Sequence, residues 1–197
     1  CSAGFYCTGR AHEADPMDGV TGNRCTVGHY CPAGSSGLTP CDPGSFCSSV
    51  GLGAPTALCS SGHFCTGSAT SSRPTDGTTG NICPTGYYCP AGTVNPRECP
   101  ASTYGPTSGN LVESQCLNCT LGSYCASAHL SAPTALCAAG FYCPPAQTSP
   151  NPASFACPVG HFCPLGTRDP KVAVGSFLCS LLFSSLLFSS LLFSSLL

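Results

Sequence analysis

The sequence has few charged residues and no tryptophan: Asp, Glu, Lys and Arg together make up 7% of its 197 residues, against roughly 25% in ordinary soluble domains. Before residue 172 it is also poor in Leu, Ile, Val and Phe, too poor to bury one large apolar core against the entropy of the chain. These shortages exclude a conventional globular domain. The six Lys and Arg are scattered singly and the formal net charge is −2, so the sequence offers no basic surface for nucleic acid.

Apolar periodicity of the helical kind is missing before residue 172, and no apolar alternation is long enough for a large sheet. Runs of Pro, Gly, Ser and Thr, such as residues 34–40 and 144–152, favour turns and extended chain. We therefore expect small disulfide-rich repeats, rich in loops and short β-hairpins, with little helix before residue 172.

What the sequence does contain is cysteine, 19 residues in all. Eight stretches share the pattern Cys, two variable residues, Gly, one variable residue, an aromatic, Cys; they occupy residues 1–7, 25–31, 41–47, 59–65, 83–89, 119–125, 137–143 and 157–163. Bridges closing short loops contribute about 2–3 kcal/mol each in the chain-entropy model. Such a cysteine density predicts an oxidising compartment, at the cell surface or outside the cell.

The spacing leaves two disulfide schemes open. In the first, each motif closes on itself and Cys99, whose unit has Gly105 in place of a second cysteine, pairs with Cys116. In the second, the last cysteine of each motif pairs with the first of the next, which forces Cys116 onto Cys119; such a short bridge is strained, so we favour the first. The candidate disulfide cysteines are Cys1, Cys7, Cys25, Cys31, Cys41, Cys47, Cys59, Cys65, Cys83, Cys89, Cys99, Cys116, Cys119, Cys125, Cys137, Cys143, Cys157 and Cys163.

Longer internal repeats indicate duplication. Residues 1–25 match 59–83, and Ala54–Cys59 matches Ala132–Cys137. We expect a first repeat block at 1–58, a second at 59–136 with an extra unit at 99–118, a truncated third block at 137–179, and a low-complexity tail at 180–197. The sequence begins inside a motif without Met, which predicts a segment of a longer protein.

The unit that starts Cys99-Pro-Ala-Ser-Thr-Tyr104 and closes at Cys116-Leu-Asn-Cys119 resembles the ephrin-receptor-like cysteine-rich repeat of extracellular mosaic proteins. It departs from that family at Ser102, where the family has Gly. The resemblance implies a small, loop-rich extracellular module without catalysis, and it implies pairing of Cys99 with Cys116.

Other chemistry has weaker support. His29, His63 and His161 lie inside motifs, but sister motifs have Phe, Ser or Tyr there, and Cys116-x-x-Cys119 has no second knuckle for zinc. We therefore expect no metal site, no cofactor and no enzyme activity, since no Asp, Glu or His recurs beside a Ser or Cys nucleophile. Asn118-Cys-Thr120 fits the N-glycosylation sequon, although its middle residue is a candidate for bridging. The aromatics of the motifs are expected to pack locally beside the bridges, and a ligand-binding ridge is the alternative reading.

Residues 172–197 are uncharged and end in repeats of Ser-Leu-Leu-Phe-Ser. Their length permits a transmembrane helix, and we expect an apolar helix at 176–197 if they are translated as a true anchor. Arg168 and Lys171 precede the segment, however, where basic residues favour the cytoplasmic side. We favour a tandem-repeat sequence appended to a truncated array; a membrane anchor and a removable lipid-anchor signal are the alternatives.

The sequence therefore predicts a non-catalytic extracellular array that spaces domains or presents weak, multivalent contacts to an unidentified extracellular protein or to itself. The first alternative is a segment of a ligand-binding receptor ectodomain, and the second is a thiol-rich metal buffer. Membrane contact is expected only if residues 172–197 are a genuine anchor.

Overall fold

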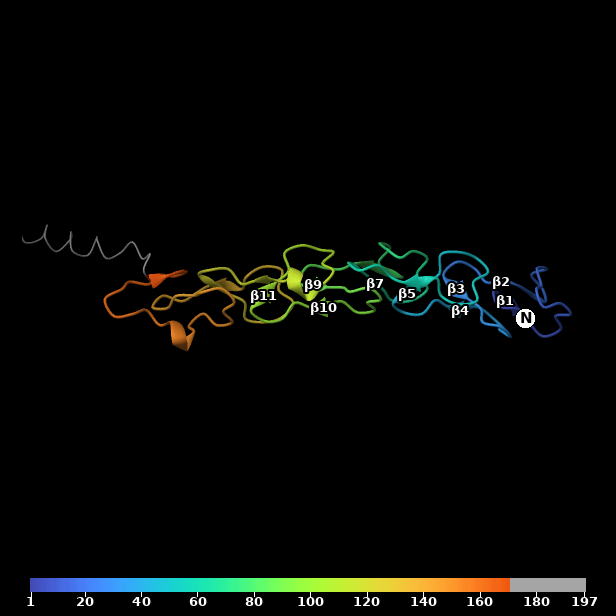
Figure 1. Cartoon of the computed structure of the whole chain (residues 1–197), viewed down its shortest axis with the longest axis horizontal. Coiled ribbons are helices and arrows are strands. Elements are labelled where there is room, and N and C mark those ends of the chain that lie inside the picture. The colour runs from blue at the N-terminus through green and yellow to red at the C-terminus, as the bar shows by residue number, and fades with distance from the viewer. Residues whose placement is uncertain (171–197) are drawn as a thin grey trace, which may run out of the picture. The chain divides into compact units, whose positions relative to one another are not determined.

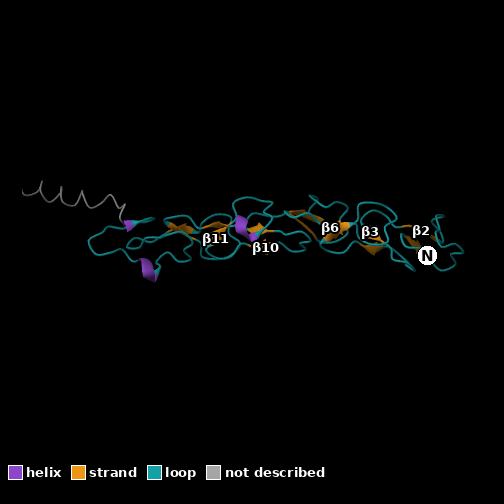
Figure 2. Ribbon diagram, viewed as in Figure 1, coloured by secondary structure: helices purple, strands orange, loops and turns teal. Residues whose placement is uncertain are grey.

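Short two-stranded hairpins joined by loops make up most of the chain, as Figure 2 shows. The computed structural model describes residues 1–170, and the apolar tail with its expected helix lies outside the described residues. Helix is scarce in residues 1–170 and includes the 3-10 turns η1 (Glu113–Gln115) and η2 (Ala153–Phe155). The expected fold class, small disulfide-rich repeats with hairpins and little helix, is confirmed.

The strands follow the order of the motifs (Figure 1), and each has two or three residues. In chain order they are β1 (Phe5–Cys7), β2 (Gly22–Arg24), β3 (His29–Tyr30), β4 (Thr39–Pro40), β5 (Ser45–Phe46), β6 (Ala57–Leu58), β7 (His63–Cys65), β8 (Gly80–Ile82), β9 (Tyr87–Tyr88), β10 (Arg97–Glu98), β11 (Thr103–Tyr104), β12 (Leu117–Asn118), β13 (Ser123–Tyr124) and β14 (Ala135–Leu136).

One rule places the hairpins: the aromatic half of a motif pairs, antiparallel, with the residues just before the next motif's first cysteine. In β5 and β6, for example, Ser45 lies opposite Leu58 and Phe46 opposite Ala57. The same register joins β1 to β2, β3 to β4, β7 to β8, β9 to β10 and β13 to β14. Each pair is too short to be stable alone, so the hairpins depend on the bridges that flank them.

The structure closes each motif on itself through a disulfide. The bridges join Cys1 to Cys7, Cys25 to Cys31, Cys41 to Cys47, Cys59 to Cys65, Cys83 to Cys89, Cys119 to Cys125, Cys137 to Cys143 and Cys157 to Cys163, with Cys99 joined to Cys116 across the variant unit. This is the connectivity of the first scheme.

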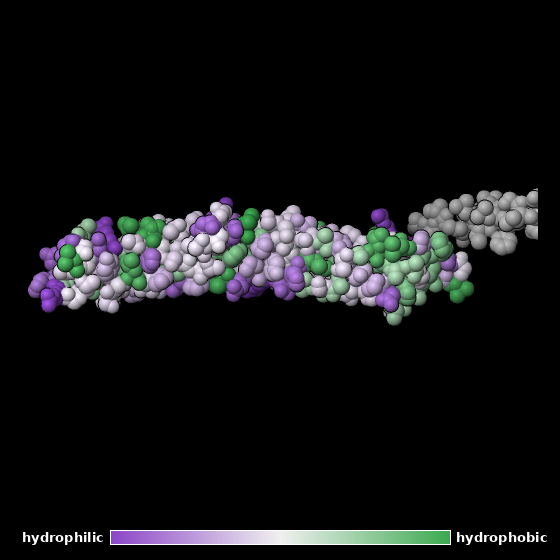
Figure 3. Space-filling model, turned by 180° about the vertical axis from the view of Figure 1, so that it is seen from behind, coloured by the Kyte–Doolittle hydropathy of each residue, from purple (hydrophilic) through white to green (hydrophobic). Residues whose placement is uncertain are grey.

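The cysteines themselves form the interior. Cys25, Cys59 and Cys89 are fully buried, as are most of the others, and Ala69 with half-buried Phe46 packs against the Cys59–Cys65 bridge. Exposed apolar side chains, by contrast, are scattered among paler ones on the face that Figure 3 shows. Disulfide burial thus replaces the apolar core that the composition excludes.

The described residues divide into two compact units. The first contains Cys1–Pro100, Gly105–Leu117 and His129–Ser131; the second contains Ala101–Tyr104, Asn118–Ala128 and the chain from Ala132 onward. The repeat blocks expected from the sequence stay a prediction. Within residues 1–170, none of the helices has the length and apolarity needed to cross a membrane.

Candidate functional site

The most regular feature of the chain is a set of backbone hydrogen bonds that joins each motif to the next. In the motif at 41–47, the Gly44 amide donates to the Cys65 carbonyl at 2.8 Å, and the Gly44 carbonyl accepts from the Cys59 amide at 2.9 Å. The glycine of one motif is therefore bonded to both cysteines of the following bridge. We call these two contacts the inter-motif hydrogen bonds.

The inter-motif hydrogen bonds recur in both units with the same atoms. In the first unit the other motif glycines that make them are Gly4, Gly28, Gly62 and Gly86, and in the second unit they are Gly122 and Gly140. Gly86 bonds to Gly105, which stands where a second cysteine is expected. The repetition shows that the motif glycine has two roles: it turns the chain inside its own motif, and its backbone forms hydrogen bonds to the next motif.

A second set of bonds comes from the linker that follows the next motif. The Gly92 amide donates to the Cys59 carbonyl at 2.9 Å, and the Cys65 amide donates to the Thr93 carbonyl at 3.0 Å. With the inter-motif bonds, these satisfy all four backbone polar groups of the Cys59–Cys65 pair. Because a buried, unpaired backbone group is costly, this pairing lets the bridges lie in the interior.

The linker residues whose amides donate to the first cysteine of a motif have positive φ. The sequence alone did not predict this backbone conformation. Ser68, His129 and Ala146 have φ of 52°, 54° and 64°, and they occupy the place that Gly34, Gly51, Gly92, Gly109 and Gly166 fill elsewhere. A positive φ is uncommon for residues other than glycine. The glycines three or four residues after a motif were the one sequence signal that could have indicated these positions.

Ser102, where the variant unit departs from the ephrin-receptor-like pattern, behaves as a motif glycine. Its φ is 75°, its carbonyl accepts from the Cys119 amide at 2.8 Å, and its amide donates to the Cys125 carbonyl at 3.3 Å. The variant unit therefore keeps the inter-motif hydrogen bonds with a less suitable residue.

The aromatic side chains of the motifs are half-buried except Phe162, which is 61% exposed, and several have polar partners. The Tyr30 hydroxyl donates to Asp42 at 3.1 Å, which raises the pKa of the tyrosine. The Tyr88 hydroxyl donates to Glu113 at 3.1 Å. Tyr142 packs edge-on against Phe155, with ring centroids 5.4 Å apart. These contacts link the rings to their own units.

The three motif histidines occupy separate places. His29 and His161 each direct Nδ1 at the carbonyl oxygen two residues earlier, at 3.3 Å. Burial lowers the pKa of His63, and the positive charge of Arg73 acts in the same direction. Across residues 1–170, no group of three His, Cys, Asp or Glu side chains is arranged to hold a metal ion.

Two aspartates stabilise matching loops in the duplicated segments. Asp18 accepts from the Thr21 hydroxyl at 2.8 Å and from the amides of Val20 and Thr21 at 2.9 and 2.8 Å, and these bonds, the hydroxyl first, lower the pKa of Asp18 to about 2. Asp76 makes the same bonds to Thr78 and Thr79, which also lower its pKa.

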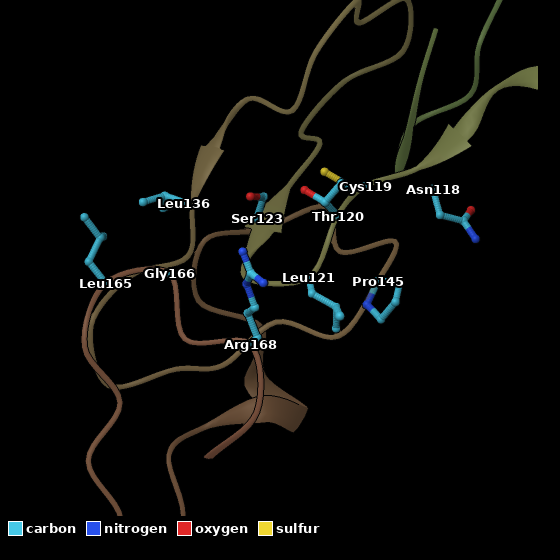
Figure 4. A pocket seen from close by; sticks show the side chains of 10 residues that line it. All are labelled: Asn118, Cys119, Thr120, Leu121, Ser123, Leu136, Pro145, Leu165, Gly166 and Arg168. Carbon is cyan, nitrogen blue, oxygen red and sulfur yellow. The ribbon is translucent and has the colours of Figure 1, made fainter. Parts of the chain in front are cut away.

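Each of the two compact units has a surface groove. One, of about 470 Å³, lies in the first unit and is lined by His12, Glu13, Pro16, Met17, Asp18 and Thr21. The other, of about 770 Å³, lies in the second unit and includes three leucines, Arg168 and Asn118 (Figure 4). Asn118, the sequon residue, is exposed on β12.

Bridged motifs, hairpins and repeated backbone bonds define this chain as a disulfide-rich repeat array. No family model matches it. It is 37% identical over 103 residues, half of its length, to the ABC-type transporter claG of Penicillium crustosum. It is 28% identical over 131 residues, 64% of its length, to ABC transporter G family member 25 of Oryza sativa subsp. japonica. The chain spans 12% of each of these relatives.

Proposed function

We propose that this chain is a non-catalytic extracellular region that acts as a structural spacer or as an adhesive array of weak contacts. The observation that carries the proposal is the repeated pairing of backbone groups between motifs. The Gly44, Cys59 and Cys65 backbone groups are all used to hold neighbouring repeats together. The backbone groups that recur from motif to motif thus serve the internal structure, as expected of a repeat array whose stability is a sum of nearest-neighbour contacts.

Two further observations support the placement outside the cell. Disulfides in this number are typical of secreted and cell-surface proteins. Both similar proteins are named as ABC transporters, and the chain matches 12% of each.

Resemblance to ephrin-receptor-like repeats, carried by Cys99, Tyr104, Cys116 and Cys119, supports the same proposal, because such repeats occur in extracellular mosaic proteins. The departure at Ser102 is compensated by its glycine-like backbone. A thiol-rich metal buffer would need free thiolates, whereas the structure has these cysteines in bridges.

Sedimentation equilibrium of the full chain, secreted from eukaryotic cells, tests the proposal. A spacer or adhesive array is expected to stay monomeric or to self-associate weakly as its concentration rises. Labelled chain that binds a single class of cell-surface partner in a saturable manner would instead favour a ligand-binding ectodomain segment.

A further inference from the structure

The sequon in the second unit presents its two functional side chains at the surface. Asn118 and Thr120 are both exposed, and Cys119 between them is fully buried and bridged to Cys125. Glycosyl transfer to asparagine needs the Asn-x-Thr pattern at an accessible site. The disulfide thus buries the middle residue without covering the acceptor.

Asn118 also stands at one end of an apolar groove. Figure 4 shows Leu136 and Leu165 at the other end, with Leu121 and Pro145 between. Leu121 is 48% exposed, so about half of this leucine side chain is open to solvent. Exposed groups of large apolar side chains often mark a contact surface. Because the sequon lies beside this group, a glycan on Asn118 could cover it.

We propose that Asn118 carries an N-linked glycan, and that its first N-acetylglucosamine packs on the end of the groove formed by Leu121 and Pro145. The inference rests on the proposed extracellular location, because the transfer takes place in the secretory pathway. The sugar has an apolar ring face and an acetyl methyl group to contact the two side chains. Arg168, which also lines the groove, offers N–H donors to sugar hydroxyls.

The covalent step is a glycosyl transfer from a lipid-linked oligosaccharide diphosphate. Asn118 Nδ2 forms a bond to the anomeric carbon, the bond from that carbon to the diphosphate oxygen breaks, and the lipid diphosphate leaves as the amide gives up one proton.

Mass spectrometry of the full chain secreted from eukaryotic cells tests the modification. Treatment with peptide N-glycosidase should convert Asn118 to Asp in the peptide that contains it, and the T120V variant should lack the glycan. A conservative T134V variant, which leaves the sequon intact, is the control. If Asn118 is unmodified while the cysteines are bridged, this inference is wrong and the proposed function stands; free thiols throughout would overturn both.

Hydroxyl-radical footprinting tests the position of the sugar. Oxidation of Leu121 should be about twofold lower in the glycosylated chain than in the N118Q variant, because the sugar removes apolar surface from water. Leu165, at the far end of the groove and 63% exposed, should be oxidised equally in both. Equal oxidation of Leu121 in the two proteins would show that the glycan projects into solvent and would overturn the packing.

Discussion

At the scale of single residues, most motif glycines are required by space as well as by backbone conformation, whereas a Cβ on Gly140 or Gly160 would meet no atom within 4 Å. A Cβ on Gly86, whose φ is +82°, would overlap the carbonyl oxygen of His129 and lie 2.8 Å from its carbonyl carbon. A Cβ on Gly34, whose φ is +81°, would have no atom within 4 Å. The two glycines thus separate steric crowding from backbone strain.

We expect G86A to destabilise the first unit more than G34A does. Both alanines bear the cost of a left-handed conformation, about 1–2 kcal/mol, and only G86A adds overpacking of about 1–3 kcal/mol. Urea unfolding of the two variants measures the difference. Equal free energies of unfolding would show that His129 moves aside and that the close approach is unimportant.

Replacement of Ser102 by glycine should stabilise the second unit. Ser102 has a φ of 75°, and relief of about 1–2 kcal/mol of left-handed strain exceeds the about 0.4–1 kcal/mol that glycine adds to the entropy of the unfolded chain. The neighbouring A101G variant is the control. Ala101 does not have a positive φ, so glycine relieves no strain there and should destabilise the second unit through the entropy of the unfolded chain. Thermal unfolding of both proteins gives the sign of each change, and a loss of stability in S102G would contradict the assigned role.

The Asp18 loop predicts a pH dependence with a definite sign. Since the folded pKa of Asp18, about 2, lies below the ordinary aspartate value of 3.8, ionised Asp18 stabilises the loop fully above its unfolded pKa, and this contribution is lost as the pH falls through about 2. Carboxyl NMR titration should show the pKa of Asp18 rising toward its ordinary value in T21V. The T8V variant removes a hydroxyl that bonds to the Val20 carbonyl instead and should leave the Asp18 pKa unchanged.

At the scale of elements, the hairpins are held by bridges whose burial differs along the chain. Cys59 and Cys65 are fully buried, whereas Cys1 and Cys7 are half-buried. Both pairs are six residues apart in the sequence, so the loop-entropy contribution is the same for both. If removal of the two bridges changes the free energy of unfolding by different amounts, the difference therefore measures how each bridge packs and how its backbone groups are paired.

We expect C59A/C65A to cost more stability than C1A/C7A. Each double variant loses about 2–3 kcal/mol of loop-closure stabilisation, and the buried pair also leaves a cavity against Ala69 and Phe46, which costs about 1–2 kcal/mol more. Chemical denaturation of the two double variants, with trypsin cleavage used to follow unfolding of the first unit, measures the stability that each variant loses. Equal losses would mean that the buried bridge packs no better than the half-buried one.

The hairpins could be predicted from sequence because the motif spacing and turn residues act locally. Phe46 and Ala57, for instance, flank a run with Pro and Gly and lie opposite each other in the hairpin of β5 and β6. The inter-motif hydrogen bonds could not, because they join backbone atoms about 20 residues apart and need no particular side chain except at positive φ. In the bonds that come from the linkers, His129 and Ala146 take a positive φ in place of glycine, so even the glycine signal is lost there. The groove beside Asn118 could not be predicted for a similar reason, since Leu121, Leu136 and Leu165 are far apart in the sequence and line one groove only in the folded chain.

At the scale of the whole chain, stability comes from many similar local contacts within each unit and very little from charge. The described residues hold one ion pair that the structure resolves, His129 with Glu98 at 3.7 Å, and both side chains are more than half exposed. Exposed pairs of this kind contribute little. The account therefore depends on the bridges: if they are reduced, residues 1–170 have neither a large apolar core nor a charge network to keep them folded.

Bridge mapping of the full chain secreted from eukaryotic cells tests this claim most directly. Alkylation without reduction, followed by proteolysis and mass spectrometry, should find nine bridges, eight of them within motifs and one from Cys99 to Cys116. Because nine bridges use 18 of the 19 cysteines, one cysteine should be alkylated. Peptides that join Cys7 to Cys25 or Cys31 to Cys41, or many free thiols with bound metal, would contradict the account.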